Sequence, residues 1–289
     1  MTSQSNTIFT KIFKNSSKTF YYSSLFFPED FQKKLEILYA FVRIADSFVD
    51  QKEQDRVGFY AFCSSYDRAK NDPNFLGFKY LANSDHDKIL KSFIQLEKQE
   101  NFNPAWTESF LYAMDMDLNK KTYENMKELT DYMYGSASVI GLYICKMLDV
   151  GEEYYQYAQT LGTAFQYINF IRDIAEDYND FGRTYIPANE LAKYGFDNLS
   201  LAQTSLYPEK FKELMLNQIG YFREWQASGL EGVNALPPKF ALAIKTAADC
   251  YEWTAKQIAK NPFVVYQKKV KPSSSRVVIT GLINMTKNR

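Results

Sequence analysis

The stretch that decides the fold class is Ala164-Phe-Gln-Tyr-Ile-Asn-Phe-Ile-Arg-Asp-Ile-Ala-Glu-Asp-Tyr-Asn-Asp180. Its polar residues recur at steps of three and four positions: Gln166, Asn169, Asp173 and Asp177. On an α-helix these side chains would span roughly 80° of one face, while most positions between them are large and apolar. Such a helix is unsuited to a solvent-facing position, so we predict a helix whose polar stripe lines an internal cavity.

A second carboxylate pair lies upstream, at Asp46 and Asp50. Helical periodicity places Arg43 and both aspartates within about 60° of one another, among mostly apolar neighbours. Buried carboxylates need partners, and a single arginine offsets only one of them. Taken alone, the pair would fit ordinary ion pairing at a solvated helix end. The presence of the other motif favours a shared site instead.

Two carboxylate pairs at i, i+4 spacing supply hard oxygen ligands without histidine or cysteine. Such ligands suit Mg²⁺, with Mn²⁺ as the alternative ion, because these ions complete their shells with water and substrate phosphates. Guanidinium groups that match phosphate oxygens lie in or near the motifs, at Arg43, Arg172 and Arg183. The residues therefore predict a site in which metal and arginine neutralise a departing diphosphate.

The composition limits the classes of protein to which the chain can belong. The chain has 289 residues, 46% of them hydrophobic, and 34 basic residues balance 34 acidic ones, which gives no electrostatic case for nucleic acid. Three distant cysteines suggest a reducing compartment. We find no signal peptide or membrane-spanning run, so a cytoplasmic protein is expected. The 17% aromatic content fits either an ordinary ring-rich core or the wall of a hydrocarbon cavity.

Helical periodicity dominates, and proline-containing breaks separate the helices. The only run that resembles a strand is Phe263 to Tyr266. We therefore predict one all-α domain over residues 1–289, with disorder expected only in residues 1–15. The predicted helices span residues 17–26, 29–50, 53–70, 84–99, 105–118, 123–148, 151–180, 207–229, 238–260 and 274–286.

A third segment, Asp131 to Gly141, gathers small residues in the first half of a predicted helix: Gly135, Ala137, Ser138 and Gly141. They would allow either close helix packing or room for a long apolar substrate, with Tyr132 as a nearby polar ring. Met114-Asp115-Met-Asp117 adds carboxylates that, taken alone, would look like ordinary helix surface. Other catalytic classes find little support, because His86 is the only histidine and no nucleotide-binding glycine motif is present.

Taken in order, these segments resemble the squalene/phytoene synthase family, the head-to-head trans-isoprenyl diphosphate synthases, most closely its phytoene synthase branch. The resemblance rests on Ser17-Lys-Thr-Phe20, Arg43 with Asp46-x-x-x-Asp50, Tyr132 to Gly141, Asp173-x-x-Glu-Asp177 and Gly182-Arg-x-Tyr-Ile-Pro187. This chain departs from the family pattern at three places. Ser16 stands where a histidine is common, Ser47 where relatives carry a second acidic residue, and Lys269 where an arginine is common.

The resemblance implies a single isoprenoid-synthase helical fold around a deep central cavity, and it implies roles for particular residues. The metal ligands would be Asp46, Asp50, Asp173, Asp177 and Glu176. The catalytic set would be Tyr132, Arg43 and the four motif aspartates. Substrate would contact Ser17, Phe20, Arg43, Asp117, Tyr132, Ala137, Gln166, Asn169, Arg172, Arg183, Tyr185, Tyr251 and Lys269.

The implied reaction joins two prenyl diphosphates through a cyclopropyl diphosphate, with Tyr132 tied to ring closure. Geranylgeranyl diphosphate would give phytoene. Farnesyl diphosphate would give dehydrosqualene, or squalene if NADPH supplies hydride. An inactive helical scaffold of the same family is the alternative from another class, whereas a chain-elongating prenyltransferase should show an Asp-Asp-x-x-Asp run, which is absent. Because the product is a hydrocarbon, we expect peripheral contact with the inner face of a membrane; the sequence leaves the oligomeric state open.

Overall fold

The structure is a computed structural model that describes residues 8–72 and 84–287. Within these ranges the chain is helical, and its only β-type pairing is an isolated parallel bridge between Thr122 and Thr184. The α-helices are α1 (Ile8–Ser16), α2 (Lys18–Ser24), α3 (Glu29–Val49), α4 (Arg56–Asn71), α5 (Ser84–Gln99), α6 (Pro104–Asn119), α7 (Met126–Met133), α8 (Val139–Met147), α9 (Tyr155–Arg172), α10 (Ile174–Phe181), α11 (Ala188–Lys193), α12 (Leu201–Leu206), α13 (Pro208–Glu231), α14 (Pro238–Lys260) and α15 (Ser274–Lys287). The predicted all-α single domain is confirmed.

Local sequence explains where several helices begin. The side chain of Asn125 accepts a hydrogen bond from the amide of Glu128 at the start of α7, and Ser17 caps α2 through the amide of Phe20. Proline occupies the first turn of α6, α13 and α14, where its missing amide costs nothing. The residues at these positions therefore determine where the helices begin, without help from tertiary contacts.

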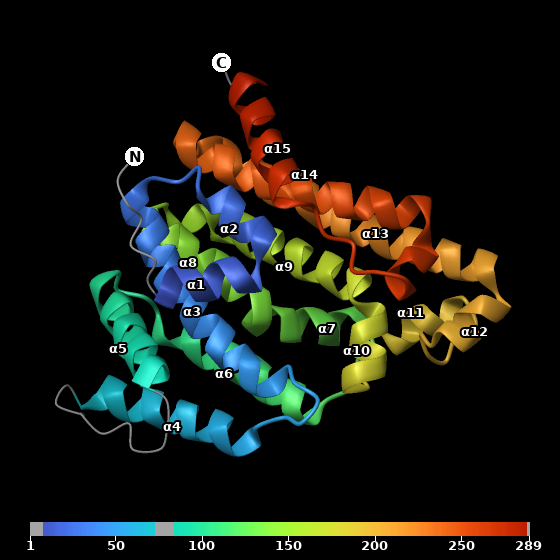
Figure 1. Ribbon diagram of the computed structural model, residues 1–289, viewed down its shortest axis with the longest axis horizontal. Helices are drawn as coiled ribbons and strands as arrows, with labels where there is room; N and C mark the ends of the chain where they lie inside the picture. Colours follow the sequence, from blue (N-terminus) through green and yellow to red (C-terminus); the bar gives the residue numbers. More distant parts are fainter. Residues whose placement is uncertain (1–7, 73–83, 288–289) are drawn as a thin grey trace.

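Helix α9 runs through the middle of the molecule (Figure 1). It packs closely along α13 and also contacts α8 and α14. Ala164, Tyr167 and Ile168 on α9 are fully buried. Glycines permit the close approach of its neighbours: a Cβ at Gly229 of α13 would lie 2.7 Å from Cβ of Leu161. The segment that decided the fold class is thus the central element of the fold.

Two predicted helices are interrupted. The predicted helix over 123–148 contains one turn of π-helix at Tyr134–Ser138, between α7 and α8. The predicted helix over 151–180 begins with a 3₁₀ turn at Glu152–Tyr154 and breaks at Asp173, whose φ of −98° and ψ of 12° separate α9 from α10. Both interruptions fall at segments that line the cavity described below, as such irregularities often do.

Three details of the secondary structure complete or correct the prediction. The run Phe263 to Tyr266 is part of a 3₁₀ helix, Pro262–Tyr266, and not a strand. Of the residues expected to be disordered, 8–15 belong to α1, because Phe13 is fully buried and packs against Tyr39; residues 1–7 lie outside the described chain. The short helices α11 and α12 were not predicted, since six residues carry too little periodicity.

Candidate active site

A cavity of about 480 Å³ opens between α2, α3, α9 and α14, a size typical of sites for small organic ligands. All the predicted site residues contribute to its lining: Ser17, Phe20, Arg43, Asp46, Asp50, Asp117, Tyr132, Ala137, Gln166, Asn169, Arg172, Asp173, Glu176, Asp177, Arg183, Tyr185, Tyr251 and Lys269. These residues come from segments up to 252 positions apart in the chain. The fold therefore brings both aspartate motifs to one site.

The cavity has a charged end and an apolar interior. Both aspartate motifs and the basic side chains of Arg43, Arg172 and Lys269 lie at the charged end. The interior is lined by aliphatic and aromatic side chains, including Leu38, Ile140, Leu161, Phe165 and Leu236. This division matches a ligand that has a polyanionic head and a hydrocarbon tail.

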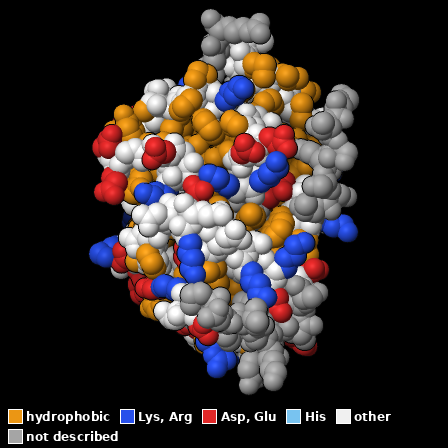
Figure 2. Space-filling view, turned by 90° about the vertical axis from the view of Figure 1, so that its left-hand side faces the viewer, with side chains coloured by type: hydrophobic (Ala, Val, Ile, Leu, Met, Phe, Trp, Pro, Cys, Tyr) orange, Lys and Arg blue, Asp and Glu red, His pale blue; other side chains and the backbone are white. Residues whose placement is uncertain are grey.

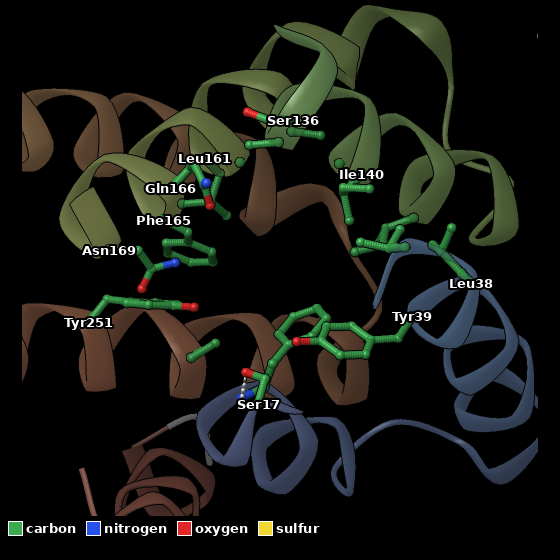
Figure 3. Close-up of a pocket in the computed structure, with 18 of the residues that line it drawn as sticks. Ser17, Leu38, Tyr39, Ser136, Ile140, Leu161, Phe165, Gln166, Asn169 and Tyr251 are labelled. Atoms are coloured by element: carbon green, nitrogen blue, oxygen red, sulfur yellow. Dashed lines mark hydrogen bonds between the residues drawn. The ribbon is translucent and has the colours of Figure 1, made fainter. Parts of the chain in front are cut away.

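Figure 3 shows how the walls face each other: Gln166, Asn169 and Phe165 project from α9, with Tyr251 below them and Tyr39 across the open space. The rings of Phe165 and Tyr251 are stacked with centroids 4.4 Å apart. Gln166 and Asn169 lie on the cavity side of α9, so the predicted polar stripe does line an internal space. Aromatic faces on both sides would stabilise a carbocation between them.

In the first motif, Asp46 and Asp50 already have cationic partners. Arg43 donates a hydrogen bond to Asp46, one turn away on α3. Nη1 of Arg183 lies 2.6 Å from Oδ1 of Asp50. Burial, together with the nearby charge of Asp50, raises the pKa of Asp46 well above its usual range. The two carboxylates thus repel each other, and a further cation between them would reduce that repulsion.

The second motif has a similar arrangement. Arg172 binds Asp173 through two guanidinium nitrogens, of which Nε lies 2.8 Å from Oδ1. Lys269 pairs with Glu176, and its Nζ lies 3.6 Å from Asp173. Desolvation, followed by the charges of Asp173 and Asp50, raises the pKa of Asp177 well above its usual range. The carboxylate of Asp50 on α3 is therefore close enough to Asp177 on α10 to raise the pKa of that residue.

Behind the first motif lies a buried network centred on Asp117. Its carboxylate accepts hydrogen bonds from the hydroxyls of Tyr132 at 2.8 Å and Tyr185 at 2.9 Å. Arg183, which is 2% exposed, donates to the carbonyl oxygens of Val49 and Asp117. Desolvation is the main cause that raises the pKa of Asp117 to about 6. Taken alone, the sequence around this carboxylate looks like ordinary helix surface, but both tyrosines and the arginine enclose it beside the cavity.

The donor set fits a divalent ion together with a diphosphate. No group of three or more acidic, histidine or cysteine side chains in residues 8–72 and 84–287 is arranged to hold a metal by itself. However, Asp46, Asp50 and Asp177 are hard oxygen donors whose mutual repulsion an added cation would relieve. Phosphate oxygens could supply the remaining ligands, as is usual for Mg²⁺. The residues that would hold the ion are those of the two motifs.

The small residues at 135–141 allow close helix packing and also leave open space in the cavity. A Cβ at Gly135 would lie 2.2 Å from the carbonyl oxygen of Ser109, and one at Gly141 would lie 2.4 Å from that of Ala158, so both glycines permit close helix packing. Ala137 and Gly141 also line the cavity. Close packing and room for substrate are therefore produced by the same residues.

Sequence reasoning missed several polar residues of the cavity, among them Tyr39 and Lys271. Tyr39 lies one turn before Arg43 on the same face of α3, so the helical spacing could have revealed it. Lys271 reaches solvent but also lines the cavity beside Lys269, and desolvation, then the charges of Arg172 and Lys269, lowers its pKa to about 8. It lies in the irregular segment after Tyr266, where no periodicity indicates which side chains point inward.

Comparison with known proteins agrees with this geometry. The family model described as squalene/phytoene synthase matches residues 13–280. The 15-cis-phytoene synthase of Enterobacter agglomerans is 28% identical over 242 residues, covering 81% of this chain and 79% of that protein. The 4,4'-diapophytoene synthase of Staphylococcus haemolyticus is 27% identical over 194 residues, covering 66% and 64%.

Solved structures share the fold at lower identity. The squalene synthase HpnC from Alicyclobacillus acidocaldarius superimposes with a TM-score of 0.74 at 20% identity, covering 89% of this chain and 93% of that one. A dehydrosqualene synthase in complex with ligand gives 0.72 at 21% identity, covering 97% and 95%. With a family model spanning nearly the whole chain and one cavity that unites its motifs, the protein belongs to the squalene/phytoene synthase family of prenyl-transferring enzymes.

Proposed function

We propose that the protein condenses two molecules of geranylgeranyl diphosphate head to head into phytoene, by way of cyclopropyl (prephytoene) diphosphate. The observation that carries the proposal is the single cavity in which two acidic motifs and their basic partners adjoin a deep apolar interior. Several relatives named phytoene synthase support the choice of product. An inactive scaffold would not need all four aspartates at one cavity end.

The charged end would bind and release diphosphate. Mg²⁺, or Mn²⁺ in its place, bound by Asp46, Asp50, Asp173, Asp177 and Glu176 would neutralise negative charge on the leaving group. Basic side chains that now pair with these carboxylates would turn to phosphate oxygens, and the guanidinium groups can do so with two parallel hydrogen bonds. They are Arg43, Arg172 and Lys269, with Lys271 beside them.

The interior would hold the allylic cation until the second substrate attacks it. The ring faces of Tyr39, Phe165 and Tyr251 border this space and offer electron density to a cation. Excluding water there prevents premature capture of the cation. Gln166 and Asn169 provide the polar positions on the α9 wall, where they could orient diphosphate or a proton-accepting water.

Ring closure requires loss of a proton from carbon, and in this proposal Tyr132 receives it. Its hydroxyl donates to Asp117, so the phenol oxygen can accept a proton as its own proton passes to that carboxylate. Because the pKa of Asp117 is raised to about 6, this carboxylate is a better proton acceptor than an ordinary aspartate. Tyr185 and Arg183 would hold Asp117 in position.

The test of this proposal is product analysis. Purified protein is incubated with Mg²⁺ and either geranylgeranyl or farnesyl diphosphate, with and without NADPH, and the extracted hydrocarbon is identified by mass spectrometry. We expect a forty-carbon product that needs no NADPH and disappears when the metal is chelated. A thirty-carbon product formed in preference would overturn the phytoene assignment and leave the family reaction intact.

The second candidate function is dehydrosqualene or, with NADPH, squalene synthesis from two farnesyl diphosphates. The similarity to a diapophytoene synthase and to the folds of a squalene and a dehydrosqualene synthase favours keeping it. The same incubation separates the two candidates.

In either case we propose that the protein works in the cytoplasm with peripheral membrane contact, since the product does not dissolve in water. No helix in the described part of the chain is long and apolar enough to span a bilayer.

A further inference from the structure

The C-terminal helix α15 has two contrasting faces. Val277, Gly281 and Asn284, spaced by four and three residues, are buried. The opposite face exposes a row of aliphatic side chains, and Ile279 is 55% exposed and Leu282 52% exposed. We call this row the α15 face: Val278, Ile279, Leu282, Ile283 and Met285. A one-sided helix with an aliphatic face left in solvent is typical of helices that lie in a membrane interface.

The buried side of α15 rests on the walls of the active-site cavity. α15 packs against α2 and α14, which carry the cavity-lining residues Phe20 and Tyr251. Contact with the turn that follows α2 is close, because a Cβ at Gly281 would lie 2.1 Å from Cζ of Phe26. Asn284 donates a hydrogen bond of 2.7 Å to Asp249 of α14. The α15 face is therefore fixed to the same helices that enclose the substrate.

Charge along the chain is segregated. Residues 1–28 and 272–289 contain six lysines and arginines and no aspartate or glutamate, although the whole chain is neutral. The rest of the chain accordingly carries an excess of six acidic residues. Both terminal segments meet where α15 packs on α2, toward the top of Figure 1. Figure 2 shows hydrophobic side chains gathered toward this end of the molecule.

We propose that the α15 face is the membrane-docking surface of the protein and that its partner is a bilayer containing anionic lipid. Five aliphatic side chains would enter the interface, and the acid-free terminal segments would be attracted to negative headgroups. The inference rests on the proposed function in one respect: a hydrocarbon product gives the docking its purpose. Docking at α15 would place the lipid next to α2 and α14, the walls of the cavity.

The experiment compares vesicle binding of three proteins by co-sedimentation. Vesicles contain phosphatidylcholine alone or phosphatidylcholine with phosphatidylglycerol. The test variant is Ile279→Ser/Leu282→Ser. The matched control is Leu201→Ser/Leu206→Ser on α12, whose leucines are 51% and 72% exposed and which lies on the other side of the molecule in Figure 1. All four side chains reach solvent, so the fold should survive; circular dichroism and thermal melting check this.

We expect the unaltered protein to bind the anionic vesicles, more weakly at high salt and on phosphatidylcholine alone. The α15 variant should bind at least about tenfold more weakly, and the α12 control should bind normally. The proposal is overturned if the unaltered protein ignores anionic vesicles or if the α15 variant binds as well as the control. It is also overturned if light scattering shows a dimer that the α15 variant dissociates, because the face would then join two copies.

A parallel assay separates this inference from the proposed function. Product formation from prenyl diphosphates dispersed in detergent needs no membrane, so the α15 variant should keep full turnover there. If the unaltered protein makes no phytoene but binds vesicles through α15, the proposed product fails and the docking surface stands. If it makes phytoene but does not bind vesicles, the docking surface fails alone.

Discussion

Replacement of Arg183 by methionine tests whether the buried charge network holds the site together. The guanidinium group is 2% exposed and donates to the carboxylate of Asp50 at 2.6 Å, to the carbonyl oxygen of Val49 at 2.8 Å and to that of Asp117 at 3.1 Å. Methionine keeps much of the side-chain volume but removes the charge beside Asp50 and one of the two donors to each carbonyl oxygen, because Nε2 of Gln54 also donates to Val49 at 2.9 Å and to Asp117 at 3.1 Å. The outcome therefore reports the loss of the charge and its hydrogen bonds.

The magnitude follows from the burial of the partners. Breaking a buried ion pair from one side costs roughly 3–5 kcal/mol. The side chain of Asp50 is 33% exposed, which favours the lower end of that range for this pair. Each carbonyl oxygen keeps its hydrogen bond from Gln54 and loses one, at a net cost of roughly 0.5 kcal/mol each. We expect a loss of about 4 kcal/mol in the free energy of unfolding, or a fall in Tm of about 7 °C for a chain of this length.

The assay is urea unfolding followed by circular dichroism, with Arg223→Met as the matched control. Arg223 pairs with Glu252 at 3.0 Å, but its side chain is 45% exposed, so its loss should cost no more than about 1 kcal/mol. Arg183→Lys keeps the charge but not the planar fork and should fall between the two. If Arg183→Met loses no more stability than Arg223→Met, the reasoning about this network is refuted.

Three further predictions concern the site and its packing. Asp46→Ala or Asp173→Ala should abolish product formation and leave helix content intact by circular dichroism; near-normal activity in either would contradict the placement of the metal site. On the alkaline side, kcat/KM should fall as pH rises through about 8, because Lys271 then loses the proton that makes it a phosphate partner. Lys271→Arg should move that limb to higher pH, and an unmoved limb would contradict the assignment. Gly135→Ala should lower the free energy of unfolding measured with urea, since its Cβ would meet a carbonyl oxygen at 2.2 Å. Gly220→Ala, with open space around its Cβ, should raise that free energy by up to about 1 kcal/mol. Equal effects of the two substitutions would contradict the packing argument.

Long amphipathic helices were predictable because their periodicity persists over many turns. Predicted and observed bounds of α3, α5, α6, α14 and α15 differ by no more than one residue at each end. The interruptions at Tyr134–Ser138 and at Asp173 were not predictable, because the periodicity continues through both. They depend on how α6 and α9 approach this part of the chain, which is a tertiary effect.

The candidate site was predictable where its residues share a helix face. Asp46 and Asp50, and the stripe that ends at Asp177, are of this kind. The local sequence around Asp117 gave no signal of its burial, which depends on Tyr185 and Arg183, more than 60 positions further along the chain; only the family resemblance included it. Lys271 escaped notice for the same reason: a loop residue carries no local signal of the cavity it faces.

The pairing of motif carboxylates with basic side chains has a consequence for the order of binding. Arg43 occupies Asp46, and Arg172 occupies Asp173, so an ion arriving alone must compete for carboxylates that are already neutralised. A diphosphate would draw both arginines to itself and release the carboxylates for the ion. Metal and substrate should then each strengthen the binding of the other, by equal factors as thermodynamic linkage requires. On the proposed function, the basic side chains at the charged end of the cavity would move from carboxylate to phosphate, and neither ligand would bind well until the other is present.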